Sequence, residues 1–281
     1  MQHTNTARQK VLSSHYLLSE ILSYLSLPDI IDKMKHINRI FEMEARHTAV
    51  ARFASIVRPY IGDHVHALVD LLRENRGIIT GSCALKMLLP HQKWQPNNLN
   101  IIVPRNAVNI FLTFFNSKQY SPTQVAIAPH LTHYASRVFR CDHLTRSLVT
   151  ITESKDSSAL TPFLASSCTT EFICMTGGGL ADIYPDLSAR RVALQSPRSS
   201  MGVPSVTRTL ATRGFVVKTT TEHVPHDPCP IAWRRINGLR GIWIEDWDEG
   251  NTIKDVFLGE HHRWRLDTEC MHPACRESRE M

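Results

Sequence analysis

The sequence lacks the long apolar run that a membrane-spanning helix requires. No segment of its 281 residues approaches about 18 consecutive apolar residues, and no apolar signal core follows the opening MQHTNTARQK. The seven cysteines are an odd number and are spread from Cys83 to Cys275, which does not suit a disulfide scaffold. We therefore expect a reduced intracellular protein with no membrane association, and cytoplasm and nucleus both stay open.

The sequence also lacks a large excess of either positive or negative charge. The chain has 32 Lys and Arg residues against 26 Asp and Glu residues, which gives a net charge of +6. This excess favours an anionic ligand but is too small to indicate nucleic acid. With 42% hydrophobic and 21% charged residues, the composition is that of an ordinary globular protein.

Several catalytic signatures are absent as well. The sequence contains no G-x-S-x-G, no Walker loop and no H-E-x-x-H, so it offers no motif of an α/β-hydrolase, a P-loop NTPase or a zincin. Cys83 lies at the start of an expected helix, where a thiolate is stabilised. Because no His or Asp can be assigned beside it, a buried core cysteine is the favoured interpretation.

The chain divides into three segments with different sequence patterns. Residues 11–59 carry Leu and Ile at helical spacing and predict a module of short amphipathic helices. Over residues 62–215 a first helix is followed by short β-like runs that alternate with helical ones, which predicts a mixed β-sheet flanked by helices. Residues 216–281 are rich in Pro, His, Trp and charge and predict an irregular C-terminal extension. The predicted fold class is α+β.

The run LLSEILSYLSLPDIIDKMKHINRIF resembles an F-box, the helical motif that docks onto the Skp adaptor of cullin-type ubiquitin ligases. It departs from the motif at two points, because Tyr16-Leu17-Leu18-Ser19 stands at the usual Leu-Pro start and Phe41 stands at the late Trp. Short helices that cannot bury all their apolar surface leave a face for a partner. The alternative is a helical cap packed on the next domain. The partner-docking residues that the resemblance implies are Leu18, Ile21, Leu22, Leu25, Ile30 and Ile31.

The stretch GIITGSCALKMLLP and the later NNLNIIV resemble the nucleotidyltransferase superfamily, whose pattern is a strand, Gly-Ser, a helix and a strand with Asp-x-Asp. The resemblance covers about residues 70–195 and is closest to a group of uncharacterised fungal nucleotidyltransferase-like proteins. It includes Leu88-Leu89-Pro90, Trp94, Pro96 and the later SSCTTEFICMTGGGLADIYPDLSARR. The resemblance implies how active relatives bind their substrate: two carboxylates on the second strand and a third on a later strand hold Mg²⁺ and a triphosphate.

The chain departs from that pattern at the metal site. Asn98 and Asn100 stand where the two aspartates are expected, and neutral amides cannot offset the charge of a divalent cation. Gly81 and Ser82 remain candidates for binding a phosphate or nucleotide, because glycine allows close backbone approach and serine supplies a hydroxyl. A turn that needs glycine for packing is the alternative.

A third carboxylate is not evident either. In SLVTI, Val149 and Ile151 share one face and the threonines share the other, with Glu153 at the end of the strand. Asp182 is a lone acid that we interpret as a strand-end or turn residue. The sequence therefore predicts a non-catalytic binding or adaptor protein, a pseudoenzyme with no catalytic residues. The alternative is a metal-dependent nucleotidyltransferase that uses Mg²⁺ and transfers NMP to an unknown acceptor.

The C-terminal extension concentrates Cys and His. Cys270, His272 and Cys275 form C-x-H-x-x-C, and Cys229 ends an upstream H-x-x-H-x-x-C. Cys and His at this density are typical of structural zinc, although neither spacing is that of a standard finger. Surface histidines and reduced cysteines are the alternative.

The same extension carries four tryptophans among arginines, an arrangement that can stack nucleic-acid bases. Asp and Glu are equally dense there, which weakens any attraction for a phosphate backbone. We expect no nucleic-acid binding, and an irregular layer covering the sheet instead.

Overall fold

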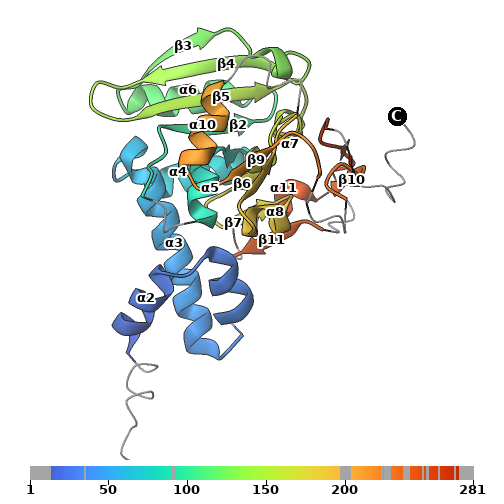
Figure 1. The fold of residues 1–281 in the computed structure, drawn as a ribbon. Helices are drawn as coiled ribbons and strands as arrows, with labels where there is room; N and C mark the ends of the chain where they lie inside the picture. The colour runs from blue at the N-terminus through green and yellow to red at the C-terminus, as the bar shows by residue number, and fades with distance from the viewer. Residues whose placement is uncertain are drawn as a thin grey trace, which may run out of the picture.

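The computed structural model describes most of the chain (Figure 1). The described residues are 14–34, 36–89, 93–196, 204–222, 224, 229–236, 241–248, 250, 253–258, 260–268 and 270–271. Helices and strands alternate around one large sheet, so the α+β prediction is confirmed. No helix within these ranges is both long and apolar enough to cross a bilayer.

The centre of the fold is an eight-stranded mixed sheet in the order β11-β7-β6-β1-β2-β5-β4-β3. Neighbouring strands are antiparallel except β2 and β5, which run parallel. The strands are β1 (Ile78–Thr80), β2 (Asn98–Val103), β3 (Ser121–Val125), β4 (Ala135–Asp142), β5 (Leu148–Ser154), β6 (Ile173–Met175), β7 (Gly179–Asp182) and β11 (Trp243–Asp246).

One face of the sheet is covered by the helices that precede and follow its first strands. Ile79, Leu99, Ile101, Val149 and Ile151 alternate onto this face and are fully buried there, as strand periodicity requires. The covering helices are α3 (Arg39–Ile61), α4 (Val65–Glu74), α5 (Ser82–Leu88) and α6 (Val108–Ser117) (Figure 1).

The opposite face is only partly covered. Ile78, Ile102, Cys174 and Ala181 are buried on it in a second core cluster. Its cover consists of the short helices α7 (Leu160–Leu164), α8 (Pro185–Ala189) and α11 (Lys254–Phe257). Toward the start of β2 this cover ends, and polar side chains replace the apolar ones. That uncovered part is where the candidate site lies.

The N-terminal helices form a module that shares a core with the sheet domain. They are α2 (His15–Ser23), the π-helical turn η1 (Asp29–Met34) and the long α3. Ser14 caps α2 and Asn38 caps α3, each through a side-chain oxygen that accepts a backbone N–H. Figure 1 shows α3 running from the module to the sheet domain, so one helix contributes to both.

Buried Arg52 of α3 binds the backbone at the end of α2. Its guanidinium donates to the carbonyl of Leu25 at 2.9 Å and so satisfies backbone left open where α2 ends. Burial lowers the pKa of Arg52 to about 10, and the group stays protonated at neutral pH. A buried arginine among Leu and Ile side chains thus has a capping role.

The C-terminal extension is less irregular than its sequence suggests. Strand β11 pairs antiparallel with β7 and forms an edge of the main sheet. Trp247 follows it, is buried, and donates its indole N–H to the carbonyl of Gly177 at 3.0 Å. The smaller elements of the fold are η2 (Pro129–Leu131), η3 (Thr169–Glu171), α10 (Pro204–Thr212), and the paired strands β8 (Val192–Leu194) with β9 (Val216–Lys218) and β10 (Arg234–Arg235) with β12 (Arg263–Trp264).

Candidate functional site

A cleft opens where β1 turns into α5, beside the start of β2. Its empty volume is about 660 Å³ when the part that is open to solvent is included. An adjoining hollow over β5 shares Gly81, Asn100 and Glu171 with it, so the two form one continuous cleft. The first part is lined by Gly81, Ser82, Leu85, Asn98, Asn100, Thr170, Glu171, Thr209, Leu210 and Arg213.

Gly81 occupies a backbone position that favours glycine. Its φ is +69°, and a Cβ there would lie 2.8 Å from the Nδ2 atom of Asn100. The structure therefore gives the residue a packing role whether or not a ligand binds. Ser82 begins α5 directly after this turn and lines the cleft, as the strand, Gly-Ser and helix pattern predicts.

Asn98 and Asn100 project from β2 into the cleft and bind each other. The Nδ2 of Asn98 donates to the Oδ1 of Asn100 at 2.6 Å, and both side chains are half-buried. The register places Asn100 between Thr80 of β1 and Thr150 of β5. The two positions at which the resemblance implies metal-binding carboxylates thus lie side by side and hold a neutral amide pair.

Strand β5 supplies hydroxyls to the cleft and no carboxylate. Thr150 and Thr152 line the adjoining hollow. Glu153 instead accepts two hydrogen bonds from the guanidinium of Arg137, at 2.8 and 3.0 Å, and one from the backbone N–H of Asn106. Burial disfavours its ionisation, but these donors outweigh burial and lower its pKa. Glu153 is therefore an ionised structural carboxylate.

Two charged residues of the cleft were not among the site residues predicted from the sequence. Glu171 lies at the end of η3 and lines both parts of the cleft; burial raises its pKa, while the N–H of Ser167 donates to its Oε2 at 3.3 Å. Arg213 follows α10, and its guanidinium lies 4.4 Å from the ring centroid of Trp94. Burial lowers the pKa of Arg213.

Asp182 lies outside the cleft. It is fully buried at the end of β7, and its Oδ1 accepts the backbone N–H of Tyr184 at 2.9 Å. Burial raises the pKa of Asp182 to about 7. This is the strand-end position that the sequence indicates, and it does not complete a metal site.

Cys83 is buried beneath the cleft. Its thiol donates to the carbonyl of Asn98 at 3.4 Å, and burial raises its pKa to about 12. The protonated thiol is a poor nucleophile at neutral pH. The core-cysteine interpretation therefore fits its surroundings.

Comparison with known proteins adds little to this geometry. No family model and no curated protein matches the chain. Among solved structures, a CCA-adding enzyme in an apo form is similar, at 14% identity and a TM-score of 0.41 over 61% of this chain. The similar part covers 43% of that structure, less than half its length. A likeness this small carries no argument about what this chain binds, so the site rests on its own residues.

The residues implied for partner docking divide into two groups. Leu18, Leu22, Ile30 and Ile31 are buried in the chain's own core, and Leu25 is half-buried. Ile21 is 43% exposed, and it lies between exposed Leu17 and Tyr24 at helical spacing on α2. Exposed Ile40, Met43 and Val50 form a similar stripe on α3.

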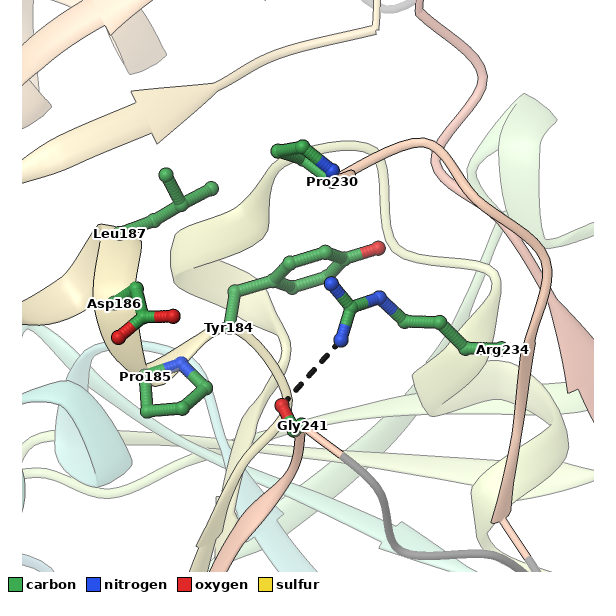
Figure 2. Close-up of a pocket in the computed structure, with 7 residues that line it drawn as sticks. All are labelled: Tyr184, Pro185, Asp186, Leu187, Pro230, Arg234 and Gly241. Atoms are coloured by element: carbon green, nitrogen blue, oxygen red, sulfur yellow. Dashed lines mark hydrogen bonds between the residues drawn. The ribbon is translucent and has the colours of Figure 1, made fainter. Parts of the chain in front are cut away.

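A further hollow lies under the C-terminal segment and is lined by Tyr184, Pro185, Asp186, Leu187, Pro230, Arg234 and Gly241 (Figure 2). Figure 2 shows the guanidinium of Arg234 lying against the Tyr184 ring, at 4.6 Å from its centroid. The same group donates to the carbonyl of Gly241 at 3.3 Å. This arrangement anchors the C-terminal segment on the sheet domain.

The residues named for zinc are only partly described. Cys229 and Cys270 are buried, with their Sγ atoms 3.9 Å apart. His272 and Cys275 lie outside the described residues. Within the described ranges, no three or more His, Cys, Asp and Glu side chains gather as a metal site.

Proposed function

We propose that this protein is a non-catalytic binding protein whose cleft has the strand, turn and helix layout of a nucleotidyltransferase without its metal-binding charge. The observation that carries the proposal is the hydrogen-bonded pair of Asn98 and Asn100. Two-metal phosphoryl transfer depends on carboxylates that hold the cations and so neutralise charge on the phosphates. A pair of amides joined by one hydrogen bond, with threonines on the neighbouring strand, leaves that charge uncompensated.

The ligand we propose for the cleft is a small phosphate-bearing molecule bound without a divalent cation. Arg213 supplies a positive charge at one side, and Ser82 and Thr209 supply hydroxyls. Glu171 is the opposing charge, and the burial that raises its pKa weakens this opposition. The balance favours a ligand with one or two phosphates over a metal-bound triphosphate.

The catalytic part of the proposal is tested with labelled nucleotides. Full-length protein is incubated with each of the four nucleoside triphosphates, with Mg²⁺ or Mn²⁺ and varied acceptors, and we expect no incorporation. Labelled product that Ser82→Ala abolishes would support the alternative, a metal-dependent nucleotidyltransferase. Glu171 is the observation that favours that alternative, since it is a carboxylate in the cleft.

The binding part is tested by calorimetry with nucleoside mono- and diphosphates. We expect the same affinity in Mg²⁺ and in EDTA, and a decrease of about tenfold in Arg213→Ala, because one charged contact contributes about 1–2 kcal/mol. Arg208→Ala is the matched control, since Arg208 is an exposed arginine on α10 outside the cleft lining. Affinity that depends on Mg²⁺, or that is unchanged in Arg213→Ala, contradicts the proposal.

For the N-terminal module we propose docking to a Skp-type adaptor. The support is the pair of exposed apolar stripes on α2 and α3, which a monomer gains nothing by exposing. Ile21→Asp is the informative variant because Ile21 is exposed, whereas a charge at buried Leu22 would unfold the module.

The docking test is co-purification of full-length protein with a Skp protein. We expect wild-type protein and Ser55→Asp, an exposed control on α3, to retain the partner, and Ile21→Asp to reduce its recovery at least about tenfold. Circular dichroism checks that both variants keep their helices. Absence of a complex with the wild-type protein removes the adaptor role and leaves the cleft proposal intact.

A further inference from the structure

We propose that a second cavity, between the N-terminal module and the sheet domain, binds a small organic acid. The carboxylate of the acid binds Arg191, and its apolar body lies against Trp243 and the end of α5. The cavity has an empty volume of about 940 Å³ when the part that is open to solvent is included. Its described lining residues and those of the cleft do not overlap, so this site is independent of the function proposed above.

The cavity lies where several elements meet. Helix α5 contributes Leu88 and Leu89 at its end, and the segment that leads into η1 forms the opposite side. Asp182 of β7 and Trp243 of β11 are partners in the sheet register, so their side chains emerge on the same face. Arg191 follows α8 directly. Junctions of this kind between structural units are preferred places for small-molecule sites.

Arg191 brings an uncompensated positive charge to the cavity. Its guanidinium is half-buried and lies 5.7 Å from the ring centroid of Phe215. Arg191 takes part in none of the ion pairs formed among the residues that the structure describes. Burial lowers the pKa of Arg191, and no carboxylate counteracts this effect. An anion bound in the cavity would supply the missing partner through charge-assisted hydrogen bonds.

The other charged groups of the lining indicate a ligand with a single negative charge. Lys33 donates to the carboxylate of Asp29 at 2.6 Å, so these two charges offset each other. Asp182 is fully buried, and burial raises its pKa to about 7, which weakens its opposition to an anion. One positive charge is left, that of Arg191. A monovalent carboxylate matches this charge, whereas a phosphate dianion exceeds it.

The remaining walls of the cavity are suited to an apolar body. Leu88 and Leu89 are buried, and the ring of Trp243 is half-buried. Pro28 and Pro185 complete this apolar part of the lining. An aromatic ring or a branched aliphatic chain placed there would bury apolar surface on both partners. The ligand class is therefore a small carboxylic acid with an aromatic or branched apolar body.

The backbone at Arg191 provides a way to separate binding from folding. Its φ is +55°, in the left-handed region that favours glycine, and it comes directly after Arg190, the C-cap of α8. Glycine at this position would relieve the backbone and remove the guanidinium at the same time. A variant that loses binding through unfolding is thus distinguished from one that loses the contact with the ligand.

The first test is calorimetry of full-length protein with two probe acids, 3-phenylpropionate and 4-methylpentanoate. We expect at least one of them to bind with a dissociation constant of about 1 mM or tighter. The matching amide, which has the same shape and no charge, should bind at least about tenfold more weakly. Absence of binding by both acids overturns the proposal, as does equal binding of acid and amide.

The second test locates the site. Arg191→Gly should unfold at no lower temperature than wild type, and it should weaken binding of the probe acid at least about tenfold. Arg190→Ala removes the same charge at an exposed neighbour outside the lining and should leave the affinity unchanged. Wild-type affinity in Arg191→Gly contradicts the proposal, and so does an equal loss in Arg190→Ala. The comparison of acid with amide on wild-type protein remains decisive if Arg191→Gly does not fold.

Discussion

Strands β2 and β7 belong to the same sheet but carry opposite kinds of polar group. The amides Asn98 and Asn100 of β2 face the cleft and are half-buried, whereas the carboxyl group of Asp182 on β7 is fully enclosed. A metal-dependent transferase needs the reverse arrangement, with its charges in the cleft. The carboxyl groups of Asp182 and Glu153 accept hydrogen bonds that hold the fold together, whereas β2 presents two neutral amides to the cleft.

The difference in surroundings explains what each group does. Asp182 accepts the N–H of Tyr184 and so organises the turn into α8. Asn98 and Asn100 bind mainly each other and hold no turn in place. Substitutions at β7 should therefore change stability, and substitutions at β2 should change what the cleft binds.

The largest expected effect is the pH dependence that Asp182 confers. Burial raises its pKa from 3.8 to about 7, so between these values the native state binds a proton that the unfolded chain releases. The contribution to stability is complete below about pH 4 and is lost as the pH rises to about 7, a change on the order of 4 kcal/mol. Asp182→Asn keeps a carbonyl acceptor and cannot ionise, so it should lack this loss.

The measurement is chemical denaturation of both proteins from pH 4.5 to pH 8. Contributions of the other groups cancel in the difference between variant and wild type. We expect Asp182→Asn to gain stability relative to wild type as the pH rises. A difference that stays flat across this range would show that Asp182 has an ordinary pKa.

The second-largest expected effect comes from removing the Asp182 side chain, which accepts the N–H of Tyr184. Asp182→Ala leaves the Tyr184 N–H buried without its partner and should destabilise the protein by about 2 kcal/mol at pH 5, where the wild-type carboxyl is protonated. Asp186→Ala is the matched control, because Asp186 is exposed in the first turn of α8. We expect that control to stay within about 0.5 kcal/mol of wild type in urea denaturation. Equal effects at the two positions would contradict the structural role of Asp182.

A smaller effect follows from restoring charge to β2. Asn98→Asp combined with Asn100→Asp replaces an amide hydrogen bond with two adjacent carboxylates, which should destabilise the protein by about 1 kcal/mol in EDTA. Mn²⁺ should reverse this loss in thermal denaturation, because it binds the folded state alone. Wild-type protein should show no Mn²⁺-dependent shift. A shift in the wild type as large as in the variant would mean that the neutral cleft already binds metal.

The parts of the fold with strong local patterns were predictable. The β-branched runs that become β1, β2 and β5 indicated strands, and their alternation placed Val149 opposite Thr150 as observed. Strand β3 was not predicted, since its sequence SPTQV contains a proline and no apolar alternation; it forms an edge by pairing with β4. Strand β11 likewise depends on pairing with β7, which local sequence does not encode.

The long helix α3 shows another limit. The sequence predicts short helices over residues 11–59, whereas α3 is one helix of 23 residues from Arg39 to Ile61. Its middle has no clean apolar stripe, because the polar residues Glu44, Thr48 and Arg52 are buried along with apolar ones. A helix buried on several sides loses the periodic signal that reveals a helix at a surface.

The residues of the site also divide into those that could be predicted from the sequence and those that could not. Gly81, Ser82, Asn98 and Asn100 belong to one strand, turn, helix and strand unit, so their convergence followed from local geometry. Glu171 and Arg213 enter the cleft from segments far along the chain, and neither was predicted as a site residue. Only the tertiary fold places a carboxylate and a guanidinium beside that unit.

The smallest expected effect concerns Glu171, the one cleft carboxylate among the described lining residues. Burial raises its pKa, so its charge is disfavoured in the fold, and Glu171→Gln should be neutral or stabilising by up to about 0.5 kcal/mol at pH 7. The variant keeps an acceptor for the Ser167 N–H and removes the charge that opposes Arg213. Affinity for a nucleoside diphosphate in EDTA should rise about twofold to threefold, since one partly screened charge contributes well under 1 kcal/mol. Glu74→Gln, at an exposed site on α4, makes the same change in net charge and should leave affinity unchanged. Weaker binding in Glu171→Gln would mean that the carboxylate contacts the ligand, and the cleft would then resemble an active metal site more than its strand β2 suggests.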